Sequence, residues 1–123
     1  MRFFEPKDYE IICEWWKEYD YPIVPLDCLP KNGLIIENLC AGFLYSTDSA
    51  LCWLEFVVGN PKATKEERSK GLDELIEGLV VLAKTKEFKY ALASVEHPNL
   101  KDKVKKLGFM ETNTCMSNFV RSL

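Results

Sequence analysis

Metal-binding and redox motifs are largely missing from this sequence. The chain has one histidine, His97, and its five cysteines include no pair in a C-x-x-C spacing. This set cannot supply a usual zinc site, so no metal ligands are predicted. An odd number of cysteines, most of them in apolar surroundings, favours reduced and mostly buried thiols, which is typical of a cytoplasmic protein. A catalytic thiol is the alternative, and His97 would have to serve as its base.

Long apolar runs and an excess of positive charge are missing as well. No segment approaches the roughly 18 apolar residues that a membrane helix requires, and residues 1–6 lack the apolar core of a signal peptide. The 16 Lys and Arg residues are outnumbered by 19 Asp and Glu residues, for a net charge of -3. This balance argues against general nucleic-acid binding but allows a local basic patch. We therefore expect a cytoplasmic protein without membrane or general nucleic-acid partners.

The composition is that of an ordinary globular protein. Hydrophobic residues make up 47% of the 123 residues and charged residues 28%, which argues against disorder. A chain of this length buries enough surface to hold a core, so residues 1–123 are expected to form one domain.

Hydrophobic spacing and turn residues divide the first half of the chain into one helix and four strands. The expected elements are a strand over 1–5, a helix over 6–19, and strands over 34–37, 40–45 and 50–58. Three prolines exclude a regular helix over 20–33, which is predicted as an ordered loop with room for one short helical turn. Short connections make the last three strands an antiparallel meander. The strand over 50–58 is apolar on both faces, so we expect it to be covered on both sides.

The second half of the chain predicts alternating helices and strands. The expected elements are a helix over 71–84, a strand over 89–95, a helix over 99–107 that ends at Gly108, and a closing hairpin from 110–112 and 115–121. A strand, a helix and a strand in succession form a crossover, so 89–95 should lie parallel to 50–58. The fold class is therefore α/β (α+β), with a mixed sheet of about six to seven strands and helices on both faces.

Four short motifs occur in order along this chain. They are a Gly-Phe pair within Leu39–Leu44, the strand Trp53–Val58, an R-x-x-G pattern over Arg68–Gly71, and a K-L-G-F pattern over Lys106–Phe109. These motifs and the order of the elements resemble the GNAT family, the Gcn5-related N-acetyltransferases, across nearly the whole chain. The pattern is also similar to small acetyltransferase-like proteins encoded by bacteriophages, which would act in the host cytoplasm.

The resemblance implies an enzyme that moves an acetyl group from acetyl-CoA, its co-substrate, to a primary amine by direct attack. Backbone amides at a helix N-terminus would hold the pyrophosphate, because these donors and the helix dipole favour anions. The pantetheine arm would bind the free backbone of the fourth strand, beside a gap between 50–58 and 89–95. The implied cofactor-binding residues are Phe56, Val57, Val58, Arg68, Ser69, Lys70, Gly71 and Leu72, with added charge from Lys65. Members of the family also dimerise through their final strands, so a homodimer is possible.

Glu55 is the only charged residue in an otherwise apolar strand. A buried carboxylate must be paired, solvated or protonated, so a structural or salt-bridged glutamate is one interpretation. The resemblance implies the other, a general base that removes a proton from the acceptor amine. Trp15 and Tyr21 border the proline-rich loop and are predicted as surface residues of the acceptor groove, whereas Trp16 fits the buried stripe of the first helix.

Several departures from the family pattern support a second interpretation. Asp73 stands where the family has a small residue, and Glu74 follows it; each would repel a nearby phosphate by about 1–4 kcal/mol. The loop over 61–68 looks longer than usual. Val104 stands where many members place a tyrosine that acts as general acid toward the leaving thiolate. The alternative is therefore a GNAT-fold binding or accessory protein without catalysis. A small structural α/β protein that shares only the topology is a third possibility.

Two further features leave alternatives open. The lysine-rich segment 101–106 is either a solvated helix face or a site for an anion such as the 3′-phosphate of coenzyme A. His97, just before Pro98, is either a surface residue or a proton shuttle.

Overall fold

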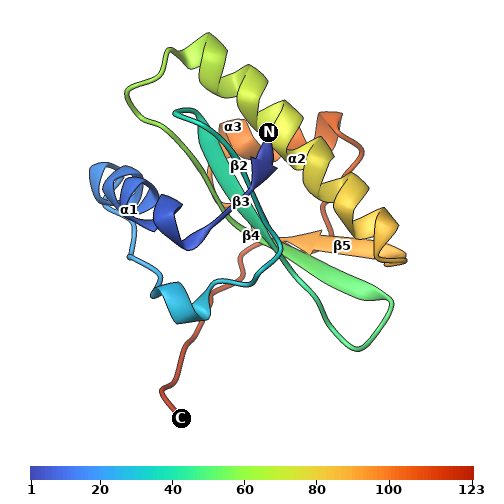
Figure 1. The fold of residues 1–123 in the computed structure, drawn as a ribbon. Helices are drawn as coiled ribbons and strands as arrows, with labels where there is room; N and C mark the ends of the chain where they lie inside the picture. The colour runs from blue at the N-terminus through green and yellow to red at the C-terminus, as the bar shows by residue number, and fades with distance from the viewer.

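The strands form one mixed sheet. In the computed structural model, which describes residues 1–123, the strands are β1 (Arg2–Phe3), β2 (Gly33–Ile36), β3 (Cys40–Tyr45), β4 (Leu51–Gly59) and β5 (Tyr90–Ala93), and they lie side by side in this order (Figure 1). The first four pair antiparallel, and β5 pairs parallel to β4. The predicted meander and the predicted parallel crossover are both confirmed.

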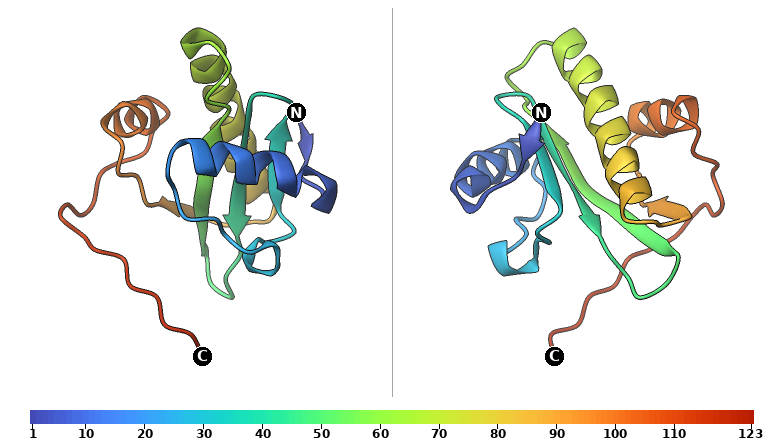
Figure 2. Two further views of the ribbon diagram at one scale, coloured as in Figure 1. Left: turned by 90° about the vertical axis from the view of Figure 1, so that its left-hand side faces the viewer. Right: turned by 45° about the vertical axis from the view of Figure 1, so that its right-hand side comes forward.

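Helices cover both faces of the sheet, as predicted (Figure 2). On one face, α1 (Tyr9–Glu18) follows the short turn η1 (Pro6–Asp8) and buries Ile12 against Phe43. On the other face, α2 (Lys65–Thr85) packs its buried stripe on β2, β3 and β4. The proline-rich loop contains one short helical turn, η2 (Leu26–Cys28). Trp16 is buried in α1, as predicted, and α2 buries Leu75, Ile76 and Leu79 on one face.

The long helix α2 begins at Lys65, and the prediction of a start at Gly71 is wrong. Thr64 is its N-cap, and the Thr64 Oγ1 atom accepts a hydrogen bond from the Glu67 backbone N–H at 3.2 Å. A threonine followed three residues later by a glutamate is a known start signal for a helix. The residues that made the preceding loop look long form the first turn of α2.

The closing hairpin predicted over 110–112 and 115–121 does not form. After α3 (Pro98–Lys106), Gly108 ends the helix with a φ of +94°, as expected, but no strand follows. The apolar residues Met116, Phe119 and Val120 do not alternate with period two, so a strand here would not bury one apolar face. The sheet therefore has five strands, and β5 is the edge strand next to β4.

Candidate functional site

β4 and β5 separate halfway along β4. Their pairing runs from Leu51 opposite Tyr90 to Leu54 opposite Ala93, while β4 continues to Gly59 without a β5 partner. The unpaired stretch includes three residues predicted to bind the pantetheine arm, Phe56–Val58. A strand edge without a neighbour offers backbone donors and acceptors to a ligand. The gap that the resemblance implied between these two strands is therefore present.

A β-bulge in β4 lies where the two strands separate. Between Ala41 and Phe43 the register of β3 against β4 shifts, and Phe56 adopts a φ of +55°. This region is strongly disfavoured for a bulky side chain. The Phe56 ring is held there by edge-on contacts with Trp16 and Tyr45, at centroid distances of 6.5 and 6.0 Å. Because a bulge bends its strand and increases the twist, β4 turns away from β5 at this point.

A cavity of about 650 Å³ lies between α2, α3 and the unpaired part of β4, and we call it the α2–α3 groove. Six of the residues predicted for cofactor or substrate binding line this groove: Tyr21, Val57, Val58, Arg68, Ser69 and Leu72. The rings of Tyr21 and Tyr19 stack at 5.2 Å on its rim. The sequence analysis did not single out Tyr19, and nothing in its spacing distinguishes it from a core aromatic.

Four of the residues predicted for cofactor or substrate binding lie outside the groove. Trp15 is only 3% exposed and lies on the buried face of α1, so its prediction as a surface residue is wrong. It forms an i, i+3, i+4 stripe with Ile12 and Trp16. Phe56 and Lys70 are exposed but do not line the groove. Gly71 faces the core.

Gly71 is a packing residue in this structure. A Cβ atom at this position would lie 2.7 Å from the Leu39 Cγ atom and 3.4 Å from the Cys40 Sγ atom. The glycine therefore lets α2 approach the connection between β2 and β3. Gly71 was predicted to let the backbone approach a phosphate. In the structure it lets α2 approach Leu39 and Cys40 instead.

The predicted cradle of helix N-terminal amides is also absent from residues 68–72. The Arg68 backbone N–H donates to the Thr64 carbonyl oxygen at 2.9 Å, and the following residues lie inside α2. Amides within a helix bond to the carbonyl four residues earlier and are not free for a ligand. The first turn of α2 instead carries Glu66 and Glu67.

Side-chain cations supply the positive charge of the groove. Four line it: Lys65 and Arg68 from α2, and Lys103 and Lys106 from α3. The Arg68 Nη1 atom donates to the carbonyl oxygens of residues 60, 61 and 63 at 3.2–3.4 Å, which holds the loop before α2. The Lys103 Nζ atom lies 2.7 Å from the Asp73 Oδ1 atom. An anion in the groove would meet lysine and arginine side chains.

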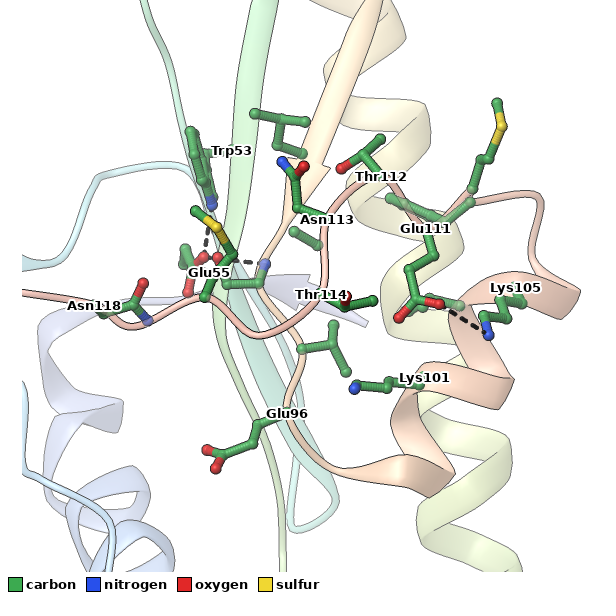
Figure 3. A pocket seen from close by; sticks show the side chains of 18 of the residues that line it. Trp53, Glu55, Glu96, Lys101, Lys105, Glu111, Thr112, Asn113, Thr114 and Asn118 are labelled. Atoms are coloured by element: carbon green, nitrogen blue, oxygen red, sulfur yellow. Dashed lines mark hydrogen bonds and ion pairs between the residues drawn. The ribbon is translucent and has the colours of Figure 1, made fainter.

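Glu55 lies at the point where β4 and β5 separate and lines a second cavity, of about 950 Å³, beside β5, α3 and the C-terminal segment (Figure 3). Its Oε1 atom accepts hydrogen bonds from the Trp53 indole N–H at 2.6 Å and from the Ser94 backbone N–H at 3.3 Å. The half-buried carboxylate thus has the partners that burial requires. Its Oε2 atom has no hydrogen-bond partner, so it remains able to accept a proton.

The remaining candidates have structural explanations. The His97 Nδ1 atom accepts a hydrogen bond from the Asn99 backbone N–H at 3.2 Å, so this exposed residue caps α3 at the edge of the groove. Val104 lines the Glu55 cavity, where it offers no proton. All five cysteines are free, but only Cys40 and Cys52 are buried, fewer than expected. Burial raises the pKa of the Cys40 thiol to about 12.

The mixed sheet, the covering helices and the forked β4 and β5 match the fold that the resemblance to the Gcn5-related N-acetyltransferases implied. No protein-family model and no curated protein matches the sequence. None of the helices combines the length and apolarity needed to cross a membrane.

Solved structures show the same fold over nearly the whole chain. An acetyltransferase of Trypanosoma brucei is 17% identical over 97% of both chains, with a TM-score of 0.70. A provisionally assigned acetyltransferase from Agrobacterium tumefaciens is 13% identical over 98% of both chains, with a TM-score of 0.64. A probable acetyltransferase is 12% identical over 99% of this chain and 98% of its own, with a TM-score of 0.63.

Proposed function

We propose that this protein binds an acyl-coenzyme A, acetyl-CoA in the first instance, and transfers the acyl group to a primary amine. The observation that carries the proposal is the fork between β4 and β5, whose free backbone edge opens into a groove lined by four cations. The solved proteins that share the fold are described as acetyltransferases, which supports the same chemistry.

The residues of the groove fit such a co-substrate in charge and in shape, although not through the predicted cradle of amides. The backbone of Val57 and Val58 would bind the amide groups of an extended arm, and Leu72 would contact its apolar parts. Lys65 and Lys106, which form no ion pair within the protein, would neutralise phosphates. When bound, acetyl-CoA supplies an activated thioester.

Glu55 would act as the general base. An amine with a pKa of about 10.4 must lose a proton before attack, which costs roughly 4.6 kcal/mol at pH 7. Trp53 and Ser94 fix one oxygen of the Glu55 carboxylate, and the other would take the proton. A carbon–nitrogen bond then forms as the carbon–sulfur bond breaks, and the second proton leaves the nitrogen and passes through water to the released thiolate.

Coenzyme A binding is the first test. Calorimetric titration should show one site, and a ligand present at 100 times its dissociation constant should stabilise the protein by about 2.7 kcal/mol in a thermal-shift assay. Absence of both signals with coenzyme A and with acetyl-CoA would overturn the proposal.

Substitution of Glu55 tests the chemical step. With a panel of amine acceptors, Glu55→Gln should lower kcat by roughly 10²- to 10⁴-fold while coenzyme A binding persists. Glu77→Gln, on the exposed side of α2, is the matched control and should retain full activity. Equal activity of the two variants would remove Glu55 from the mechanism.

The alternative function is ligand or partner binding without catalysis. It is favoured by the two acidic residues in the first turn of α2, Glu66 and Glu67, and by Val104 in place of a proton-donating tyrosine. This alternative predicts no turnover with any amine, whatever the affinity for coenzyme A. Acetylation that disappears in Glu55→Gln would exclude it.

A further inference from the structure

We infer that Asp73 sets the affinity of the α2–α3 groove for anions by holding Lys103 in an internal ion pair that a ligand must open. We call the contact among Ser69, Asp73 and Lys103 the α2–α3 clasp. The inference rests on the proposed function, because the anion is taken to be the phosphorylated part of an acyl-coenzyme A.

The clasp uses the full hydrogen-bonding capacity of the lysine. The Lys103 Nζ atom lies 2.7 Å from Asp73 Oδ1, 2.9 Å from Ser69 Oγ and 3.0 Å from the Ser69 carbonyl oxygen. A lysine ammonium has three N–H donors and no more. A phosphate in the groove can therefore bind Lys103 only by replacing one of these three acceptors.

Asp73 is the acceptor that an anion would replace. Its side chain is 51% exposed, whereas that of Lys103 is only 14% exposed, so the carboxylate is free to rotate into solvent. The Ser69 carbonyl oxygen is fixed in α2. Asp73 also repels an incoming phosphate while it stays in place, so both effects weaken anion binding.

The groove contains a matched acid that does not hold a lysine. Asp102 lines the same groove from α3 but forms no ion pair. Asp73→Asn and Asp102→Asn each remove one negative charge from this groove, but only the first removes the charge that pairs with Lys103. Comparison of the two variants separates the clasp from the general electrostatic effect.

Calorimetric titration with coenzyme A tests the inference. We expect Asp73→Asn to bind roughly three- to tenfold more tightly than the wild type, the size expected for a half-exposed charge, and Asp102→Asn to change less than about twofold. In a Lys103→Met background, which keeps the apolar stem of the side chain, the gain from Asp73→Asn should vanish. A gain that persists there, or one equal to that of Asp102→Asn, would overturn the inference.

Hydrogen exchange of the free protein provides a readout that needs no ligand. The amides of α3 should exchange faster in Asp73→Asn than in Asp102→Asn, because the ion pair between α3 and α2 is reduced to a hydrogen bond with a neutral side chain. Unchanged exchange would count against the clasp, whatever the titration shows.

The outcomes separate the two proposals. Coenzyme A binding by the wild type with no gain in Asp73→Asn would refute the inference and leave the proposed function standing. Binding by Asp73→Asn alone would support the clasp as a block of the groove. No binding by any variant would refute both.

Discussion

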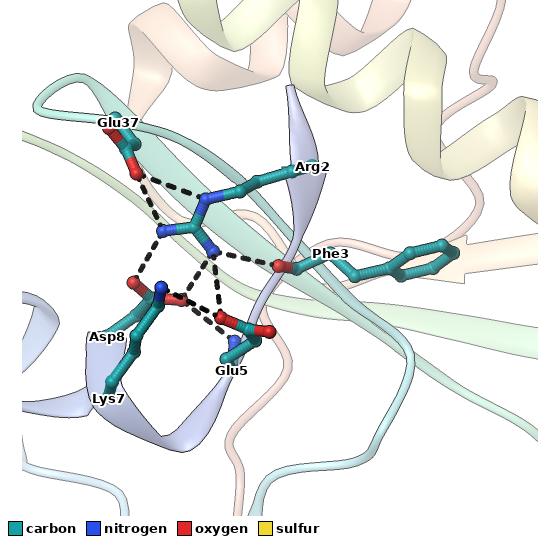
Figure 4. A network of polar contacts seen from close by, with 6 residues as sticks. All are labelled: Arg2, Phe3, Glu5, Lys7, Asp8 and Glu37. Atoms are coloured by element: carbon teal, nitrogen blue, oxygen red, sulfur yellow. Dashed lines mark hydrogen bonds and ion pairs between the residues drawn. The ribbon is translucent and has the colours of Figure 1, made fainter.

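Arg2 connects the first strand to two distant parts of the chain. Its guanidinium donates to both carboxylate oxygens of Asp8, at 2.7 and 2.9 Å, and to Glu37 Oε1 at 2.9 Å (Figure 4). Asp8 is only 8% exposed and also accepts from the Glu5 backbone N–H at 2.8 Å. Hydrogen bonding from Arg2 is the largest of the effects that hold the pKa of Asp8 below its ordinary value. The cluster fixes β1, the start of α1 and the turn after β2.

The lowered pKa of Asp8 predicts a specific loss of stability in acid. The ionised carboxylate stabilises the fold fully above the unfolded pKa of about 3.9, and this contribution is lost as the pH falls through the lower native value. The free energy of unfolding, measured by urea denaturation between pH 2.5 and 7, should therefore be higher for the wild type than for Asp8→Asn near pH 7. This difference should disappear below about pH 4. A constant difference between the two proteins across this range would contradict the prediction.

At the scale of elements, α2 shows that two glycines in one helix have different roles. A Cβ atom at Gly71 would meet Leu39, which packs on the core, whereas a Cβ atom at Gly78 would meet mainly the Met1 Sδ atom, at 2.8 Å, with the Leu34 Cδ1 atom farther away at 3.2 Å. Met1 is 60% exposed and its flexible end can move. The effect of a glycine-to-alanine substitution on stability therefore depends on which neighbouring side chain must shift.

The two alanine variants should have different effects on the free energy of unfolding. Alanine gains about 1 kcal/mol over glycine in a helix interior, but overpacking a core costs typically 1–3 kcal/mol. We expect Gly71→Ala to destabilise the protein by about 1–2 kcal/mol and Gly78→Ala to leave it unchanged or stabilise it by up to about 1 kcal/mol. Urea denaturation measures both, and a Gly71→Ala protein at least as stable as the wild type would show that α2 is not tightly packed there.

At the scale of the whole molecule, the sheet ends at a free β5 edge and the chain ends in an exposed segment. Residues 110–123 add no strand, and several of their apolar side chains are exposed: Met110, Met116, Phe119, Val120 and Leu123. None of these residues takes part in a backbone hydrogen bond. The homodimer expected from the resemblance stays a prediction, for which sedimentation velocity is the measurement.

Removal of residues 112–123 should leave the fold intact. Surface residues without backbone hydrogen bonds contribute little to global stability, so we expect Tm to change by less than about 2 °C. Residues 110–118 line the Glu55 cavity, so the same deletion should alter activity more than stability. A large fall in the thermal denaturation temperature would show that the segment packs on the sheet.

The identity of most elements followed from local patterns in the sequence. The strand over 40–45 has the predicted bounds, and Trp16 is buried in α1 as predicted, although Trp15 is buried as well. The start of α2 was also encoded locally, in Thr64 and Glu67, but the polar, lysine-rich residues before Gly71 were predicted to lie outside the helix. The role of Gly71 was not encoded locally, because a glycine permits close approach either to a phosphate or to a neighbouring side chain.

The sequence by itself determined the alternation of helices and strands, because periodicity, caps and turns act between residues a few positions apart. Only the tertiary structure decided which faces met. It placed Gly71 against Leu39, separated β4 from β5 at a bulge, and paired Lys103 with Asp73 across thirty positions. Such contacts depend on how whole elements pack, because side chains far apart in the chain come together only when the core is complete.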